Sequence, residues 1–134
     1  MIVVDTSVLI AIALGEPEAI AFKPILAASK NKIGWHSLLK AKMALAKHSP
    51  ASPDTFLMAI TRQPNVDMVG FTEKFWPHAA IGFERFGKGR HEASLSYGDC
   101  MTYALAVGLE APLLFKDSRF NLTDLRVHQG SITD

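Results

Sequence analysis

Apolar residues along this chain fall into short uninterrupted runs, separated by longer stretches in which they recur every three to four positions. The short runs predict β-strands and lie at residues 2–4, 32–35, 66–71 and 113–115, with a weaker one at 125–127. The stretches between them have the spacing of amphipathic helices. Because strands that alternate with helices build βαβ units, the pattern predicts an α/β fold with a mainly parallel sheet.

Turn-forming and capping residues separate the predicted helices. They mark three helix boundaries, at residues 15–18, 52–54 and 72–74. Residues 86–96 are rich in glycine and basic residues and lack apolar periodicity, which predicts an exposed loop. This loop leads into a helix that opens near Gly98-Asp99 and ends within residues 108–112.

The composition is that of one globular domain covering residues 1–134. Hydrophobic residues make up 49% of the chain, which is enough for a single core. The 14 Lys and Arg residues nearly balance the 13 Asp and Glu residues, so any affinity for nucleic acid must come from a local patch. Cys100 is the only cysteine, which excludes an internal disulfide and a cysteine-rich zinc site.

The sequence has no feature typical of secretion or membrane insertion. Its first residues lead directly into the strand at 2–4, without the basic region and cleavage site of a signal peptide. The apolar stretch at 8–14 is too short to cross a bilayer. Together with the single cysteine, these features predict a cytoplasmic protein with no membrane partner.

Three acidic residues stand where strands end or helices begin. Asp5 follows the first strand, Asp99 opens a helix, and Asp117 follows the strand at 113–115. Ligands of open α/β sheets bind at the carboxyl ends of the strands, so these carboxylates are expected at one sheet edge. Crowded carboxylates repel unless a cation joins them, and Mg²⁺ prefers such ligands. A divalent cation there would serve phosphodiester hydrolysis.

Each acid also has a purely structural interpretation. Asp5, or Thr6 or Ser7 after it, is suited to cap the following helix. The helix dipole favours an acid such as Asp99 in a first turn, and Asp117 is of a type common in turns. The spacing alone leaves both interpretations open.

Four blocks of the sequence form a recognisable set. They are Val-Val-Asp-Thr-Ser-Val-Leu-Ile at residues 3–10, Phe-Glu-Arg-Phe-Gly-Lys-Gly-Arg-His at 83–91, Gly-Asp-Cys with Tyr-Ala-Leu-Ala within 98–106, and Ala-Pro-Leu-Leu-Phe-Lys at 111–116. Together they resemble PIN-domain ribonucleases of the VapC toxin type, over almost the whole chain. The resemblance implies a three-layer α/β/α fold, Mg²⁺- or Mn²⁺-dependent cleavage within RNA, a homodimer, and a cognate antitoxin protein that neutralises the toxin.

The resemblance also implies roles for individual residues. Asp5 and Asp99 correspond to metal ligands, and Asp117 is a candidate third catalytic acid. Thr6 and Ser7 are placed to orient Asp5 or a metal-bound water.

The basic loop adds candidate contacts to RNA. Lys88, Arg90 and His91 form a local cationic segment suited to phosphates, and with Ser7 they are the predicted substrate-binding residues. The alternative is a solvated loop that binds nothing.

The sequence departs from the family pattern in two places. The helix after the second strand normally carries a glutamate of the acidic cluster, where this chain has Lys40. Lys40 either points at the site, where it opposes a cation or contacts phosphate, or extends outward, so that the site only loses an acid. The common final motif Phe-Lys-Gly-x-Asp-Phe is replaced by Phe-Lys-Asp-Ser-Arg-Phe at 115–120. Asp124 is a second candidate for that acid and otherwise a surface turn residue.

Aromatic and histidine residues are interpreted as structural. Five aromatic side chains follow core-like spacings, which predicts packing rather than platforms for stacking bases. They are Trp35, Phe75, Trp76, Phe83 and Phe86. His36 and His48 lack metal-ligand spacing and are expected at the surface or an interface.

The sequence features are compatible with two functions of different classes. The first is an active metal-dependent endoribonuclease toxin, which the acids within the family-like blocks favour. The second is a catalytically impaired PIN fold kept for binding an antitoxin, RNA or a second copy, which Lys40 and the altered final motif favour. A phospho-receiver domain is set aside, because Asp5 is followed by Thr6 and Ser7 rather than belonging to paired acids after the first strand.

Overall fold

The structure is a computed structural model that describes residues 1–48, 51–116 and 119–133. In this part of the chain, one sheet of parallel strands has the order β3-β2-β1-β4. The strands are β1 (Ile2–Val4), β2 (Asn31–Gly34), β3 (Val66–Val69) and β4 (Leu113–Leu114). The helices are α1 (Thr6–Ala13), α2 (Ala19–Ala28), α3 (Trp35–Leu45), α4 (Asp54–Thr61), α5 (Trp76–Phe86) and α6 (Tyr97–Gly108), and a 3₁₀-helix, η1 (Arg119–Leu122), follows β4.

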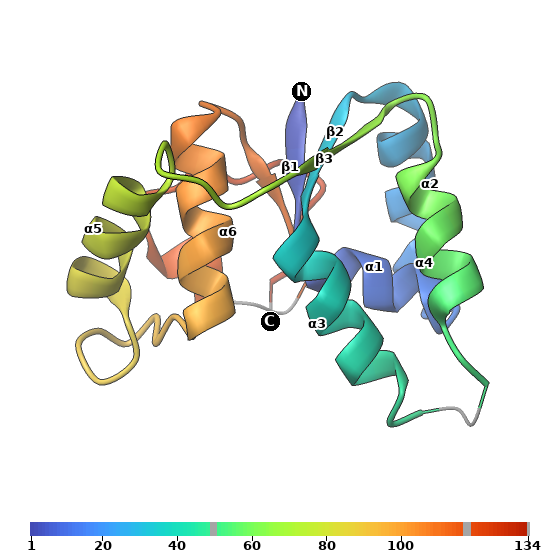
Figure 1. The fold of residues 1–134 in the computed structure, drawn as a ribbon, viewed down its shortest axis with the longest axis horizontal. Helices are drawn as coiled ribbons and strands as arrows, with labels where there is room; N and C mark the ends of the chain where they lie inside the picture. Colours follow the sequence, from blue (N-terminus) through green and yellow to red (C-terminus); the bar gives the residue numbers. More distant parts are fainter. Residues whose placement is uncertain (49–50, 117–118, 134) are drawn as a thin grey trace.

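Helices cover both faces of the sheet, so the fold has three layers (Figure 1). Helices α5 and α6 pack on one face, and α1 to α4 pack on the other. The side chains of β1 alternate between the two cores: Val3 faces α5 and α6, while Ile2 and Val4 face α1 and α2. Because β1 is covered on both faces, all three of its residues are apolar and buried. The predicted three-layer α/β/α fold with a parallel sheet is confirmed.

Some observed elements differ in extent from the predicted ones. The predicted strand at 125–127 is wrong, because only Val127 forms a β-bridge, with Leu113. Since β4 is two residues long, it offers this segment little to pair with. Helix α5 begins at Trp76, after a turn at residues 73–75. Among the described helices, none is long and apolar enough to cross a membrane.

The aromatic residues divide between the core and the surface. Phe75 and Phe86 are buried, as predicted. The prediction is wrong for three others, whose exposed fractions are 50%, 62% and 47%: Trp35, Trp76 and Phe83. On α5, the stripe that holds Ala79 and Phe86 is buried, whereas Trp76 and Phe83 lie on another stripe. A seven-residue spacing recurs on every side of a helix, so it does not tell which side is covered.

Candidate active site

Asp5 joins the end of β1 to the start of α1. Its Oδ2 accepts hydrogen bonds from the Ser7 backbone N at 3.1 Å and from Ser7 Oγ at 2.6 Å, so the capping interpretation is confirmed. The residue is only 6% exposed. Burial raises the pKa of this carboxyl above its usual 3.8, while the bonds from Ser7 act to lower it. A buried carboxyl with a raised pKa is typical of functional sites.

Ser7 connects the ends of β1 and β4. Its Oγ donates to Asp5 and accepts a hydrogen bond from the Lys116 backbone N at 2.9 Å. This pair of bonds holds the Asp5 carboxylate in one orientation, which is the positioning expected of Ser7. Thr6 has a different contact, because its Oγ1 donates to the Ser37 carbonyl at 3.1 Å and ties α1 to α3.

Asp99 lies in the first turn of α6, where it forms a capping box with Ser96. Its Oδ2 accepts a bond from the Ser96 backbone N at 3.0 Å, and its own backbone N donates to Ser96 Oγ at 3.2 Å. The charge of Asp99 also helps to raise the pKa of Asp5. The two carboxylates are therefore close enough to repel each other.

One hollow of about 420 Å³, called here the acidic hollow, contains both acids. It lies where the ends of β1 and β4, the loop before α6, and α3 come together. The residues that line it are Asp5, Thr6, Ser7, Ile10, Lys40, Ala93, Ser94, Asp99, Lys116 and Arg119. The structure thus brings Asp5 and Asp99 together as the strand-end argument predicts. Asp117 lies outside the described residues, so its place in the cluster stays a prediction.

Lys40 points at the acidic hollow rather than away from it. Its Nζ lies 3.4 Å from Asp99 Oδ1, and its side chain is 51% exposed. An exposed pair of this kind contributes roughly 0–1 kcal/mol to stability. The Lys40 charge also acts to lower the pKa of Asp5. A cation bound between Asp5 and Asp99 would therefore meet a positive charge beside one of its ligands.

Two further cations line the acidic hollow. Lys116 Nζ lies 3.2 Å from Glu16 and 3.6 Å from Glu18, so carboxylates from the segment between α1 and α2 balance its charge. Arg119 Nη1 donates to the Glu92 carbonyl at 2.9 Å. No sequence pattern marks Arg119 as part of this hollow, because its place beside the acids depends on how η1 packs against the loop before α6.

The basic loop residues lie outside the acidic hollow. Lys88 and Arg90 line a different hollow, between α5 and α6. His91 has a structural contact, since its Nδ1 accepts a bond from the Ala93 backbone N at 3.0 Å and its ring meets Phe86 edge-on. Contact of these three residues with RNA stays a prediction, and the structure does not bring them to the two acids.

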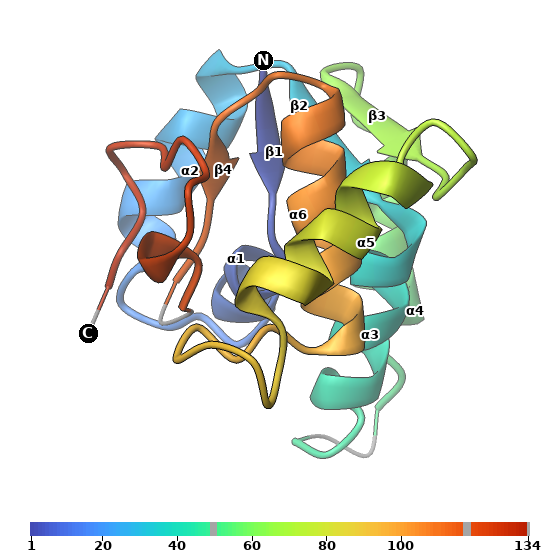
Figure 2. The same cartoon turned by 90° about the vertical axis from the view of Figure 1, so that its left-hand side faces the viewer.

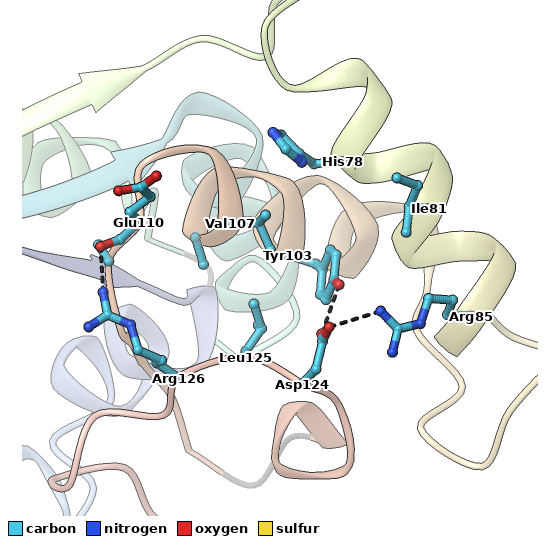
Figure 3. Close-up of a pocket in the computed structure, with 11 residues that line it drawn as sticks. His78, Ile81, Arg85, Tyr103, Val107, Glu110, Asp124, Leu125 and Arg126 are labelled. Carbon is cyan, nitrogen blue, oxygen red and sulfur yellow. Dashed lines mark hydrogen bonds and ion pairs between the residues drawn. The ribbon is translucent and has the colours of Figure 1, made fainter.

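Asp124 belongs to another hollow, bounded by α5, α6 and the segment after η1 (Figure 3). Its Oδ1 accepts a bond from the Tyr103 hydroxyl at 2.8 Å, and its Oδ2 pairs with Arg85 at 3.0 Å. Burial, then the hydrogen bond to Asp124 and its charge, raise the pKa of Tyr103 to about 12. Asp124 therefore joins α5 to the C-terminal segment, and it does not take part in the acidic cluster.

His36 is partly buried, where it lies between two helices. Its Nε2 lies 2.8 Å from Thr102 Oγ1, so the ring bridges α3 and α6. Burial, followed by the nearby charge of Lys40, lowers the pKa of His36 from 6.5 to about 4. His48 is exposed, as predicted.

Stability is expected to fall as pH drops from about 6.5 toward 4, partly through His36. Because the pKa of His36 is lower in the folded chain than in the unfolded chain, its stabilising contribution is complete above pH 6.5 and is lost below it. After allowance for solvent screening, we expect protonation of this group to lower the free energy of unfolding by about 1–2 kcal/mol. Urea unfolding across this pH range should show a flatter pH dependence for His36→Gln than for His48→Gln. Equal slopes in the two variants would contradict the prediction.

The donor set of the acidic hollow fits Mg²⁺ held by few protein ligands. Across residues 1–48, 51–116 and 119–133, no group of three or more His, Cys, Asp or Glu side chains could hold a metal ion. Asp5 and Asp99 supply two carboxylates to this hollow. Mg²⁺ is commonly bound by one or two carboxylates together with waters and substrate phosphate. Lys40 is the feature that opposes such binding.

Comparison with known proteins identifies the family. The PIN domain family matches residues 2–125 of this chain. Ribonuclease VapC of Mycolicibacterium smegmatis is 34% identical over 124 residues, which cover 92% of this chain and 96% of that protein. The chain belongs to the VapC-type PIN-domain ribonucleases. Ribonuclease VapC30 of Mycobacterium tuberculosis is similar to this PIN domain at 32% identity, over 92% of the chain and 95% of the relative.

Solved structures share the fold of this VapC-type chain. VapC20 of Mycobacterium tuberculosis, a sarcin-ricin loop cleaving toxin, superposes with a TM-score of 0.75 at 18% identity, over 93% of this chain and 96% of that one. A chain of a toxin–antitoxin complex from Klebsiella pneumoniae has a TM-score of 0.73 at 15% identity, over 96% and 97% of the two chains. These likenesses confirm the PIN-like fold.

Proposed function

We propose that this chain is a Mg²⁺-dependent endoribonuclease toxin that hydrolyses RNA phosphodiester bonds, with Mn²⁺ as a second suitable cation. The observation that carries the proposal is the convergence of Asp5 and Asp99 in one hollow of a VapC-type PIN domain. Each of the two carboxylates also caps a helix, and Lys40 offsets part of the negative charge beside Asp99. A cation bound by both carboxylates would relieve their remaining repulsion.

In this proposal, the side chains of the acidic hollow have different roles in hydrolysis. Asp5 and Asp99 would hold the cation, and bound Mg²⁺ supplies Lewis acidity at the scissile phosphate and a water of lowered pKa. Ser7 keeps Asp5 in one orientation through its bonds to that carboxylate and to the backbone N of residue 116. Arg119 and Lys40 stand at the same hollow, where their positive charges suit the phosphates of RNA.

The alternative is a catalytically impaired PIN fold that binds RNA or protein without cleaving. It is favoured by the 3.4 Å approach of Lys40 Nζ to Asp99 Oδ1, because a lysine beside a ligand weakens cation binding. The two functions predict different effects of Lys40→Glu, which restores an acid at this position, on the rate of RNA cleavage.

The proposed partners are RNA, a cognate antitoxin protein and a second copy of the chain. A toxin–antitoxin complex among the structural neighbours supports the antitoxin. Exposed apolar side chains on α3, namely Trp35, Leu39 and Met43, provide a surface that suits a protein partner. The site of action we propose is the cytoplasm, where an RNA substrate is found.

RNA cleavage by the purified chain tests the proposed function directly. An end-labelled RNA with a single-stranded loop is incubated with Mg²⁺, Mn²⁺ or EDTA, and the products are separated on a denaturing gel. Internal cuts that require an added cation support the proposal. Absence of cleavage with both cations would contradict it in favour of the impaired alternative.

A further inference from the structure

Lys116 lies just beyond the point where the pairing between β1 and β4 ends. The two strands pair as far as Leu114, whose carbonyl accepts a bond from the Asp5 backbone N at 3.0 Å. The next bond in this direction goes to a side chain: the Lys116 backbone N donates to Ser7 Oγ at 2.9 Å. The position of this N–H is therefore not fixed by the pairing of β4 with β1.

Two carboxylates hold the other end of Lys116. Its Nζ lies 3.2 Å from Glu16 and 3.6 Å from Glu18, and its side chain is only 13% exposed. The segment that carries these glutamates is itself held, because the Glu16 backbone N donates to the Ala11 carbonyl of α1 at 2.9 Å and the Glu18 carbonyl accepts from Phe22 of α2 at 3.1 Å. Figure 2 shows the chain leaving β4 toward the end of the molecule where α1 starts and where this segment passes.

A partly buried ion pair of this kind is better suited to fixing a geometry than to adding stability. The cost of removing the charges from water offsets much of their attraction, so the net gain in stability is small. The pairing nevertheless leaves Lys116 few alternative positions, because a buried ammonium group needs a charged partner. Its backbone N–H is thereby held against Ser7.

The direction of the Ser7 hydroxyl hydrogen depends on this N–H. A serine has one hydroxyl hydrogen, and within a helix it can also donate to a backbone carbonyl of the preceding turn. With the Lys116 N–H on the Ser7 oxygen, the hydrogen is directed to Asp5 Oδ2, at 2.6 Å. Lys116 thus acts on the Asp5 carboxylate through Ser7.

We infer that Lys116 is a positioning residue of the acidic hollow, whose ammonium group and backbone N–H together fix the Ser7–Asp5 pair in the orientation that binds the cation. The inference rests on the cation site of the proposed function and adds to that site a residue outside the ligand set, with the segment between α1 and α2 that anchors it. Groups that orient the ligands of a metal typically change its affinity 10- to 100-fold when they are removed.

Charge alone predicts the opposite effect for this residue. Lys116 lines the acidic hollow, so loss of its positive charge would strengthen cation binding if only its charge mattered. If Lys116 acts by position, Lys116→Met should instead weaken Mn²⁺ binding about 10-fold. The measurement is calorimetric titration of Mn²⁺ into the full chain. Lys32→Met is the matched control and should bind Mn²⁺ like the parent, because Lys32 is a partly buried lysine that pairs with Asp67 on β3.

A double variant tests whether the effect passes through Ser7. Ser7→Ala should weaken Mn²⁺ binding about as much as Lys116→Met, and the two changes together should weaken it no further, because both break the same connection. A general loosening of the fold would instead add a second loss to the first. Lys116→Arg keeps the charge and the pairing with the glutamates, so it should bind Mn²⁺ nearly as well as the parent.

Variants of the glutamates give a second route to the same test. Glu16→Gln combined with Glu18→Gln removes both anchors and leaves Lys116 in the chain. This variant should also bind Mn²⁺ about 10-fold more weakly than the parent. It replaces Lys116→Met if thermal unfolding in EDTA shows that Lys116→Met does not fold, and parent-like affinity in it would then overturn the inference.

The outcomes separate this inference from the proposed function. Mn²⁺ affinity in Lys116→Met equal to or above that of the parent overturns the inference, while Asp5-dependent RNA cleavage by the parent leaves the function intact. Additive losses in the double variant with Ser7→Ala also overturn it. A parent that binds Mn²⁺ through Asp5 without cutting RNA contradicts the function, and the same affinities still decide the role of Lys116. A parent that binds no Mn²⁺ overturns both, because Asp5 then holds no cation.

Discussion

Asp5→Asn is expected to lower the rate of RNA cleavage by at least about 100-fold while the chain stays folded. Several kcal/mol of transition-state stabilisation depend on a cation held by this carboxylate, and about 1.4 kcal/mol corresponds to a tenfold change in rate. Asn has nearly the same shape and caps helices as well as Asp does, so the bond from the Ser7 backbone N can persist. The measurement is the initial rate of product formation from a labelled RNA with Mg²⁺ in excess.

Thermal unfolding separates this loss of activity from a loss of structure. Burial raises the pKa of Asp5, so the contribution of this group to stability is complete below its usual pKa of 3.8 and is lost as pH rises through the folded-state value. Asn stays neutral at every pH. Without metal, Asp5→Asn should therefore unfold at the same temperature as the parent or higher at neutral pH, with the difference narrowing as pH falls. A variant that melts well below the parent would contradict this account of the buried carboxyl.

Asp124→Asn is the matched control for Asp5→Asn. It makes the same chemical change at a carboxylate whose partners are Tyr103 and Arg85, outside the acidic hollow. Parent-like cleavage is expected, together with a small loss of stability from the weakened pairing with Arg85. If both variants lost activity equally, the acidic hollow would not be the catalytic site.

Lys40→Glu is expected to tighten binding of Mn²⁺ or Mg²⁺ by about tenfold or more. Two unit charges 4 Å apart interact with about 1 kcal/mol in water and about 4 kcal/mol at an effective dielectric constant of 20. Because Lys40 is half exposed, the lower figure applies, and the substitution both removes a repulsion and adds an attraction. Calorimetric titration of the cation into the purified chain measures this directly, without any substrate.

The same variant should be less stable than the parent when no cation is present. A glutamate at position 40 replaces a favourable pair with Asp99 by a repulsion between carboxylates. The melting temperature of Lys40→Glu should then rise with added Mn²⁺ more steeply than that of the parent. No such difference would mean that the side chain at position 40 does not act on a cation held by Asp5 and Asp99.

Lys42→Glu is the control for Lys40→Glu, because it changes the net charge equally from the same helix. Lys42 pairs with Asp54 at 2.8 Å, at the start of α4. Its substitution is expected to leave cation affinity close to that of the parent. Cleavage rates then decide between the two functions: a large gain in Lys40→Glu supports the impaired alternative, and a parent already as active as Lys40→Glu contradicts it.

The acids of the candidate site are largely predictable because their placement has local causes. A run of buried apolar residues ends at Asp5, and a capping sequence surrounds Asp99, so each carboxylate is tied to the end of a strand or the start of a helix. Parallel strands bring such ends to one edge of the sheet. The same local causes explain why both acids also cap helices: the structural and functional interpretations are compatible at these positions.

Contacts between elements far apart in the sequence are not predictable from local patterns, because they depend on tertiary packing. The direction of Lys40, the approach of Arg119 to the acids and the burial of His36 depend on how α3, α6 and η1 pack together. The exposure of Trp76 and Phe83 is a further case, because helical periodicity marks a stripe without telling whether another element covers it.

Hydrophobic spacing and turn chemistry by themselves determined that this chain forms a parallel α/β sheet with Asp5 and Asp99 at strand and helix ends, since both signals act between residues close in sequence. Only the tertiary structure decided that Lys40 stands against Asp99, that Asp124 belongs to another hollow, and that the rings of α5 are open to solvent. These features are set by which helices meet across the sheet, and that choice depends on packing between residues far apart in the chain.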